Sequence, residues 1–275
     1  HPSFPKNRLG SICNISCCEI LICSDEDLAD LEYLLYNYSI KQIISLNERT
    51  QKIKIFRNLS IEKKFFDSKN LNTKSKIIDE AYVLFTSGST GIPKGISISR
   101  INLYNYLNNI KNVVKVSSTD NLTHLFELSF DLSIHDIYIT LLNGATLCIP
   151  TKSDLLLPVN YISRNQISIW FSVPSFIANM EKLGILKKEK FSDIHTSLFC
   201  GEPLTILNAQ LWQSACPNSK VINLYGPTEA TIATTFFEYT NIDKNNSKAL
   251  RGYVPIGNPF GGNRCYLKNL NDEEI

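Results

Sequence analysis

One segment of the sequence is dense in groups that can bind an anion. It reads Thr86-Ser87-Gly88-Ser89-Thr90-Gly91-Ile92-Pro93-Lys94-Gly95 and stands between two short apolar runs. Glycines let the backbone turn tightly and direct N–H groups at an anion, while four hydroxyls and the Lys94 ammonium can follow a chain of phosphates. The segment lacks the G-x-x-x-x-G-K-[ST] order of a P-loop and does not open directly into a helix. We therefore predict a phosphate cradle of another kind, with a plain surface turn as the alternative.

Two further segments place a carboxylate among turn-forming or helix-starting residues. They read Asn223-Leu224-Tyr225-Gly226-Pro227-Thr228-Glu229 and Phe130-Asp131-Leu132-Ser133. Glu229 follows a Gly-Pro turn and offers the hard oxygen that Mg²⁺ prefers. Asp131 stands ahead of an apolar helical run, where it could pair with a cation or simply cap the helix.

Taken in order, these three segments resemble the adenylate-forming (AMP-binding) superfamily, which contains acyl-CoA synthetases, luciferases and the adenylation domains of nonribosomal peptide synthetases. The loop preceded by Ala81 to Phe85 is similar to the family's phosphate loop. The segment ending at Glu229 is similar to its N-x-Y-G-P-T-E signature, and the segment around Asp131 to the F-D-x-S element of its amino-acid-activating branch.

The resemblance implies ATP and Mg²⁺ as cofactors and assigns roles residue by residue. Lys94, Thr228 and Glu229 would be catalytic, with Glu229 as the metal ligand, Thr228 donating to the α-phosphate and the Tyr225 ring lying against adenine. The loop Gly201-Glu202-Pro203 would lie on the other face of adenine. The implied ATP-binding residues are Thr86, Ser87, Gly88, Ser89, Thr90, Gly91, Lys94, Gly201, Glu202, Pro203, Asn223, Tyr225, Gly226 and Thr228.

Asp131 separates two branches of the family, because a buried carboxylate can pair with an α-ammonium but would be left unpaired by an acyl tail. The resemblance lines the substrate pocket with Asp131, Leu132, His135, Phe171, Leu198, Cys200, Leu224, Ile232 and Ala233. Phe171 and Leu224 are large, so a small, uncharged side chain is expected, as in the D-alanine:carrier-protein ligases that the chain resembles here. His135 departs from the pattern and is either a polar pocket group or a helix-face histidine, and Leu128 replaces an expected aromatic residue.

Apolar periodicity predicts how these segments are positioned. A β-α-β unit is expected from Glu19 to Leu46, with its helix from Asp25 to Tyr38, followed by an irregular connection from Asn47 to Asp79 with an edge strand at Ile53 to Phe56. Further predicted strands are Ala81–Phe85, Ile96–Ser99, Leu122–Leu125, Thr146–Ile149, Ser168–Ser172, Ser197–Phe199, Val221–Leu224 and Thr234–Glu238. Predicted helices are Arg100–Val114, Ile134–Leu142, Pro174–Leu183 and Leu204–Ala215. The alternation indicates an α/β fold with largely parallel sheets flanked by helices.

Composition and net charge limit the classes of binding partner that are expected. The 275 residues carry a net charge of +2, with 43% hydrophobic and 20% charged residues, so a small molecule is favoured over nucleic acid or a membrane. No apolar run has the length of a membrane span and the residues from His1 to Leu9 lack the apolar stretch of a signal peptide, so a cytoplasmic protein is expected. The loop-like opening suggests that the chain begins inside a larger reading frame. The eight cysteines show no C-x-x-C pair, which favours reduced, mostly buried thiols over zinc.

The resemblance covers residues 1–275 as part of the family's large domain, incomplete at both ends. The ribose-binding aspartate, the hinge and the small carboxyl-terminal domain with the catalytic lysine would follow Ile275, so this fragment alone is expected to be inactive or impaired. The implied reaction forms aminoacyl-AMP and pyrophosphate, then transfers the aminoacyl group to the phosphopantetheine thiol of a carrier protein. The alternatives are an acyl- or aryl-CoA ligase and a truncated, non-catalytic nucleotide-binding module.

Overall fold

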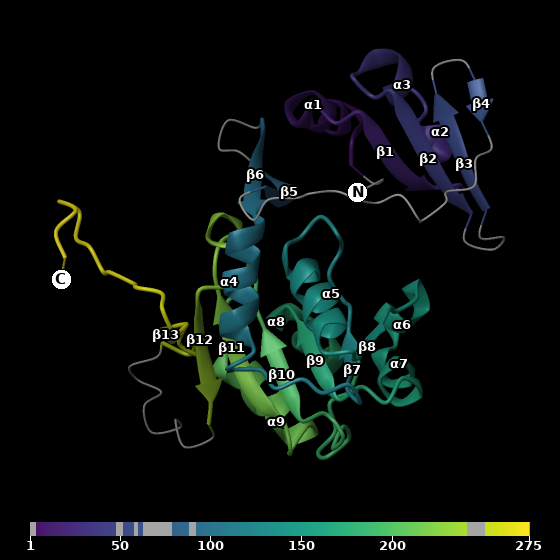
Figure 1. The fold of residues 1–275 in the computed structure, drawn as a ribbon. Helices are drawn as coiled ribbons and strands as arrows, with labels where there is room; N and C mark the ends of the chain where they lie inside the picture. The colour runs from purple at the N-terminus through teal and green to yellow at the C-terminus, as the bar shows by residue number, and fades with distance from the viewer. Residues whose placement is uncertain are drawn as a thin grey trace. The chain divides into compact units, whose positions relative to one another are not determined.

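The computed structural model describes residues 4–47, 52–57, 60–62, 79–87, 92–240 and 251–274. The chain divides into two compact units, His1–Ser97 and Ile98–Ile275, and each is described by itself (Figure 1). The predicted mixture of helices and strands is confirmed, with every predicted strand present within a few residues of its expected bounds.

The first unit is built on a four-stranded sheet in the order β1-β2-β3-β4. Strands β1 (Ile20–Ser24) and β2 (Gln42–Asn47) are parallel, which confirms the β-α-β unit. The single helix expected between them is two short ones, α2 (Leu28–Leu31) and α3 (Leu34–Asn37). The break falls where the N–H of Leu35 bonds to the third residue before it, Glu32, instead of the fourth.

Other parts of this unit differ from the sequence prediction. Strand β3 (Lys52–Arg57) is not an edge strand, because β4 (Ser60–Glu62) pairs with its other side. The opening, expected to be loop-like, contains helix α1 (Lys6–Ser16), with Pro5 at its N-cap. Strands β5 (Glu80–Ser87) and β6 (Pro93–Ser99) flank the predicted phosphate loop and form a two-stranded sheet.

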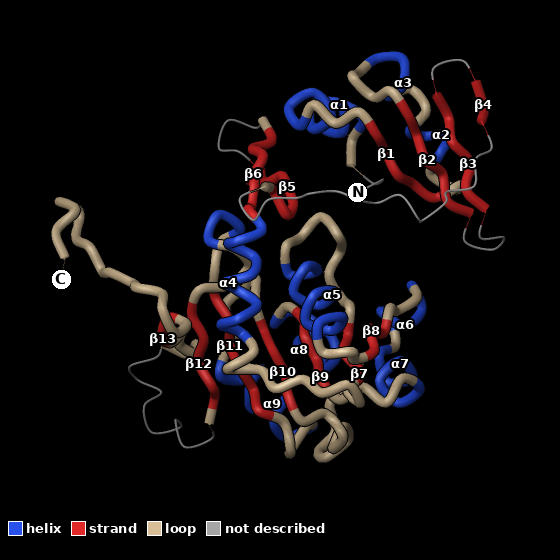
Figure 2. Tube along the Cα trace, viewed as in Figure 1, coloured by secondary structure: helices blue, strands red, loops and turns tan. Residues whose placement is uncertain are grey.

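The second unit has a seven-stranded sheet in the order β13-β12-β11-β10-β9-β7-β8 (Figure 2). The strands are β7 (Asn121–Thr123), β8 (Thr146–Cys148), β9 (Ile169–Ser172), β10 (Thr196–Phe199), β11 (Lys220–Tyr225), β12 (Thr235–Tyr239) and β13 (Asn258–Pro259). The first five are parallel to one another, while β12 and β13 are antiparallel. The largely parallel sheet is thus confirmed, with its antiparallel part at one edge.

Helices lie on both faces of this sheet (Figure 1). Helices α4 (Arg100–Ile110) and α5 (Leu132–Leu142) lie on one side, and α8 (Pro174–Lys182) and α9 (Ile206–Ala215) on the other. Two short helices not expected from the sequence, α6 (Lys152–Leu156) and α7 (Pro158–Arg164), follow β8. Helix α4 ends at Ile110, before the expected Val114, although Val114 is itself buried.

The alternation of side chains along β9 explains the two layers, because successive strand residues point to opposite faces. Trp170 packs against Trp212 of α9, with ring centroids 5.0 Å apart, and against Phe176 of α8. Phe171, the next residue, packs against His135 of α5 on the other face. Each tryptophan donates its indole N–H to a buried serine hydroxyl, so both indole N–H groups in the larger core on the α8–α9 side are paired.

Candidate active site

The predicted site segments of the second unit meet at one edge of the sheet. Parallel strands end at the same edge, and ligands collect there in α/β sheets. The loop leading to Asp131 follows β7, Cys200 and Gly201 follow β10, and Tyr225 ends β11. The structure therefore brings together groups that the sequence separates by almost a hundred residues.

Asp131 is the most informative residue at this edge. Its side chain is buried and its Oδ2 has no hydrogen-bond partner among the described residues. Burial raises the pKa of this carboxyl, although the backbone N–H of Ile232 and the Thr228 hydroxyl partly offset the effect. The alternative that Asp131 caps α5 is wrong, because the side chain makes no capping hydrogen bond. A buried carboxylate oxygen without a donor is a site that a ligand ammonium would stabilise.

The turn that faces Asp131 has an uncommon backbone. After the short helix η2 (Thr228–Ala230), Thr231 and Ile232 have φ angles of 66° and 67°. Both are β-branched, and the left-handed region costs such residues about 1–3 kcal/mol each. The Ala233 N–H closes the turn on the Thr231 carbonyl at 2.8 Å. Strain of this kind persists where the surrounding structure fixes it, here with the Ile232 N–H directed at a carboxylate.

Gly226 allows this turn to pack against β11. A Cβ at this position would lie 2.5 Å from the Ala233 Cα, which leaves no room for a side chain. The close approach is held by the N–H of Thr234, which donates to the Tyr225 carbonyl at 2.8 Å. The Gly-Pro turn of the predicted signature therefore has a structural reason in this chain.

The residues predicted to surround the substrate side chain are all buried. Burial raises the pKa of the Cys200 thiol to about 12, and the nearby Asp131 carboxylate adds to the effect, so this thiol stays protonated. Phe171 and Leu198 are direct partners in the β9–β10 register and share the face that α5 covers. The other residues of this set are Leu132, His135, Leu224, Ile232 and Ala233.

His135 is a neutral member of this group. Burial lowers its pKa to about 3, so the imidazole carries no charge at neutral pH. Its Nδ1 lies 2.7 Å from the Tyr106 hydroxyl, and its ring meets the Phe171 ring at a centroid distance of 4.9 Å. His135 is thus a buried histidine on the face of α5 that is directed at Tyr106 and Phe171.

Sequence reasoning missed two aromatic residues beside this group. Phe126 packs on Phe171 with centroids 4.8 Å apart, and Tyr106 supplies the hydroxyl that His135 meets. Tyr106 falls with Leu103, Leu107 and Ile110 on the buried stripe of α4. A tyrosine on an otherwise aliphatic stripe is the signal that could have identified it, because a buried hydroxyl needs a partner.

A second buried pair lies next to the site and was also missed. Asp136 of α5 is buried, and its Oδ2 is 3.3 Å from Nδ1 of His124, which follows β7. Burial raises the pKa of Asp136 to about 7, despite the lowering effect of the His124 hydrogen bond. This pair joins α5 to the sheet one residue along from His135.

The structure describes only some of the residues that are predicted to bind ATP. Gly88, Ser89, Thr90 and Gly91 lie outside the described residues. Thr86 and Ser87 end β5, and Lys94 lies on β6 with an exposed side chain. Gly95 packs under the Phe85 ring, where a Cβ would come within 3.2 Å of it. The first unit therefore holds both strands beside the loop.

The remaining predicted nucleotide residues belong to the second unit. Glu202 accepts hydrogen bonds from the Ser175 N–H and hydroxyl at 2.9 and 3.0 Å, and so fixes the Gly201–Pro203 loop to the start of α8. The Asn223 amide donates to the Val254 and Pro255 carbonyls, which makes it a tie to the following segment. The Tyr225 ring and the Glu229 carboxylate are both exposed at the sheet edge.

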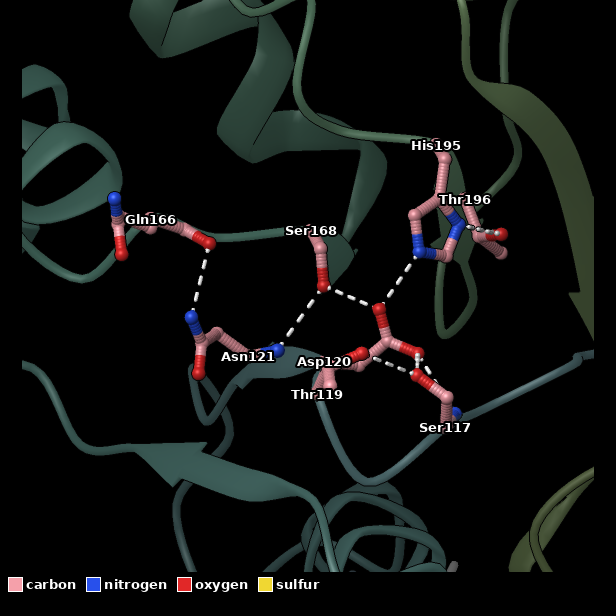
Figure 3. A network of polar contacts seen from close by, with 8 residues as sticks. All are labelled: Ser117, Thr119, Asp120, Asn121, Gln166, Ser168, His195 and Thr196. Carbon is pink, nitrogen blue, oxygen red and sulfur yellow. Dashed lines mark hydrogen bonds and ion pairs between the residues drawn. The ribbon is translucent and has the colours of Figure 1, made fainter.

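A separate polar network lies at the opposite, amino-terminal edge of the strands (Figure 3). Asp120 Oδ1 lies 2.8 Å from Nε2 of His195 and accepts from the Ser168 hydroxyl at 2.7 Å, while Oδ2 accepts from Ser117. Burial alone would raise the pKa of Asp120, but these hydrogen bonds lower it to about 2. The network joins the starts of β7, β9 and β10, and we interpret it as structural.

Three further observations on the described residues concern metal-binding clusters, disulfides and membrane-spanning helices. No group of three or more His, Cys, Asp or Glu side chains there is arranged to hold a metal ion. The eight cysteines are free thiols, of which Cys13, Cys148, Cys200 and Cys216 are buried. Among the same residues, no helix combines the length and the apolar character needed to cross a bilayer.

Comparison with known proteins gives consistent results. A family profile described as AMP-binding enzyme matches residues 1–275. A ligase from Pseudomonas fluorescens that joins L-proline to the L-prolyl carrier protein is 32% identical over 211 residues, which are 73% of this chain and 41% of that protein. The D-alanine–D-alanyl carrier protein ligase of Bacillus licheniformis is 35% identical over 182 residues, or 65% of this chain and 36% of the ligase.

Solved structures agree in fold. The crystal structure of IdnL7 superposes with a TM-score of 0.78 at 26% identity, covering 95% of this chain and 52% of that one. The Vibrio cholerae adenylation domain AlmE, solved in complex with glycyl-adenosine-5'-phosphate, gives a TM-score of 0.70 at 29% identity over 97% of this chain and 47% of its own. This chain thus spans about half of these structures and less than half of the curated relatives.

Proposed function

Because this chain belongs to the AMP-binding enzyme family, we propose that the full-length protein is an ATP-dependent ligase that activates a small, uncharged amino acid. The carboxylate of the amino acid attacks the α-phosphate of ATP, aminoacyl-AMP forms and pyrophosphate leaves. The aminoacyl group then passes to the phosphopantetheine thiol of a carrier protein. The two similar ligases, which act on L-proline and D-alanine together with their carrier proteins, support this class of reaction.

The observation that carries the proposal is the unpaired Oδ2 of buried Asp131. An α-ammonium would supply both the charge and the hydrogen bond that this oxygen lacks. A fatty or aryl acid has no such group and would leave the oxygen buried and unpaired, at a cost of about 1–3 kcal/mol. The site therefore favours amino acids over the substrates of an acyl- or aryl-CoA ligase.

The same corner supports the placement of the reacting phosphate. The Thr228 hydroxyl faces Asp131, and Glu229 follows it in the same short helix. An amino acid held by its ammonium at Asp131 would have its carboxylate close to Thr228, which can donate to an α-phosphate oxygen. The family resemblance independently assigns Lys94 and the segment from Thr86 to Gly91 to the phosphates of ATP.

Mg²⁺ fits the residues present. Magnesium usually keeps several waters and takes one or two carboxylates together with substrate phosphates, so a single exposed carboxylate such as Glu229 is a sufficient protein donor. When bound, the ion would neutralise charge on the phosphates.

A protein that uses ATP and a carrier thiol in this way would work in the cytoplasm.

The proposal is tested by pyrophosphate exchange on the full-length protein. The panel contains the twenty common amino acids, D-alanine, and fatty and aryl acids, each with ATP and Mg²⁺. We expect exchange with small, uncharged amino acids and none with the acids that lack an ammonium. Exchange driven by an acyl or aryl acid, or no exchange with any amino acid, would overturn the proposal.

A further inference from the structure

The position of His135 relative to Asp131 defines where a substrate side chain would end. Asp131 is the N-cap residue of α5 and has a helical backbone conformation, and the N–H of His135, four residues later, donates to its carbonyl. The two side chains therefore lie on one face, with Cβ atoms about 5–6 Å apart. If an α-ammonium is held at Asp131, as the proposed function requires, the imidazole lies one helical turn further along the same face. A short side chain would span this distance.

The contacts of His135 among the described residues are with aromatic rings, one of which carries a hydroxyl. Its ring contacts Phe171 and Tyr106, with centroids 4.9 and 6.0 Å away, and it is 1% exposed. Among the described residues, the Tyr106 hydroxyl is the polar group that its Nδ1 meets, at 2.7 Å. Tyr106 is held in turn by its ring contact with Phe260, which stacks on Phe236 of β12.

This arrangement leaves Nε2 as the second polar atom of the imidazole. A neutral imidazole has one donor and one acceptor nitrogen. When Tyr106 donates to Nδ1, Nε2 carries the proton and is a donor; in the other tautomer Nε2 is an acceptor. A hydroxyl group can pair with Nε2 in both cases, whereas a methyl group pairs with neither form.

We propose that Tyr106 and His135 form a neutral pair that selects the substrate side chain, favouring a small amino acid with a hydroxyl group over an aliphatic one of equal size. This inference rests on the proposed function, because it needs an amino acid anchored at Asp131. His135 contacts the side chain, and Tyr106 is a positioning residue that fixes the orientation and tautomer of the ring. Phe171, packed against the ring, limits the length of the side chain.

The expected preference is measurable. A buried polar atom left without a partner lowers binding about 10-fold or more, so replacing a hydroxyl by a methyl should be disfavoured by at least that factor. An uncharged imidazole offers no opposite charge to a cationic side chain. The inference therefore predicts serine-sized substrates ahead of alanine and 2-aminobutyrate.

The test measures kcat and KM for pyrophosphate exchange by the full-length enzyme with both enantiomers of serine, alanine and 2-aminobutyrate. The variants are His135→Leu and Tyr106→Phe. Tyr161→Phe is the matched control, because this buried tyrosine also donates to a fixed partner, the Cys148 carbonyl at 2.6 Å, but belongs to the core on the opposite face of the sheet. We expect His135→Leu to abolish the serine preference and Tyr106→Phe to reduce it through a higher KM, while Tyr161→Phe keeps it.

A wild-type preference for alanine or 2-aminobutyrate over serine, or a preference that survives His135→Leu, would overturn the inference. Exchange with no amino acid would instead overturn the proposed function. The pair itself is tested separately by ¹⁵N chemical shifts of the His135 imidazole, assigned from the signal lost in His135→Leu. A neutral ring whose Nδ1 signal moves in Tyr106→Phe supports the pair, and a charged ring at pH 7 or an unmoved signal contradicts it.

Discussion

Replacing Asp131 by asparagine should lower kcat/KM for every amino acid. It should also remove the free-energy penalty of a buried carboxylate from the substrate-free protein. The substitution keeps the size of the side chain and deletes its charge. A hydrogen bond between charged groups contributes about 1.5–3 kcal/mol, which corresponds to a loss of roughly 10- to 150-fold in kcat/KM. Because the ammonium is common to all amino acids, the loss should be similar for each and their ranking should not change.

The same substitution should alter the pH dependence of stability. Burial raises the pKa of Asp131 in the folded protein above its unfolded value of about 3.9. As pH rises above that value, the unfolded chain loses this proton first, so the folded state is progressively disfavoured until its own pKa is passed. Asparagine cannot ionise, and the variant should therefore gain stability relative to the wild type across this window.

The assays are pyrophosphate exchange on the full-length enzyme and thermal unfolding between pH 4 and 8. Asp154→Asn is a suitable control, because Asp154 forms a capping box with Thr151 away from the Asp131 loop, so its loss should affect stability and leave the ranking of substrates unchanged. Wild-type activity in Asp131→Asn, or a loss that depends on the substrate side chain, would refute the pairing of this carboxylate with the ammonium.

Three further predictions concern the phosphate-binding residues, the size of the substrate pocket and the Asp120 network. Lys94→Ala and Glu229→Ala should each cost about 2–4 kcal/mol in transition-state stabilisation, measured as kcat/KM, with unchanged circular dichroism; full activity would remove that residue from the mechanism. Phe171→Ala with Leu224→Ala should extend exchange to valine or leucine, because overlap in a packed site costs about 1–3 kcal/mol, and an unchanged substrate range would show that these residues do not limit size. Asp120 has a folded pKa of about 2, below its unfolded value, so its stabilisation is complete above about pH 4 and is lost as pH falls towards 2. Asp120→Asn should therefore reduce the dependence of the unfolding free energy on pH between about pH 4 and 2. An unchanged pH dependence would contradict the role of these hydrogen bonds in stability.

Much of the fold follows from local patterns that the sequence displays. Leu103, Leu107 and Ile110 recur at helical spacing and are all buried, as an amphipathic helix requires. Helix α1 was missed because its buried face consists of Gly10 and Cys13, which give no apolar stripe. The internal position of β3 could not be predicted either, since it depends on the pairing of β4 and not on β3 itself.

The sequence offers the residues of the candidate site as a prediction, but it does not give their arrangement. The segment around Asp131 indicated the carboxylate, yet one N–H that this carboxyl accepts comes from the left-handed turn at Ile232, a hundred residues later. The contact of Tyr106 with His135 likewise joins two helices and leaves no trace in local spacing. Asn223 is an opposite case, since its signature position suggested a ligand contact while its amide is engaged with backbone carbonyls.

The two tryptophans described above are the whole tryptophan content of the chain, and both belong to the second unit. Their indoles are buried together on the α8–α9 side of the sheet, away from α5. Intrinsic tryptophan emission will therefore report the loss of that core and will be insensitive to unfolding of residues 1–97. A coincidence test for cooperative unfolding of this chain needs a second optical signal, and a residue such as Tyr33 of the first unit offers a natural position for a tryptophan reporter.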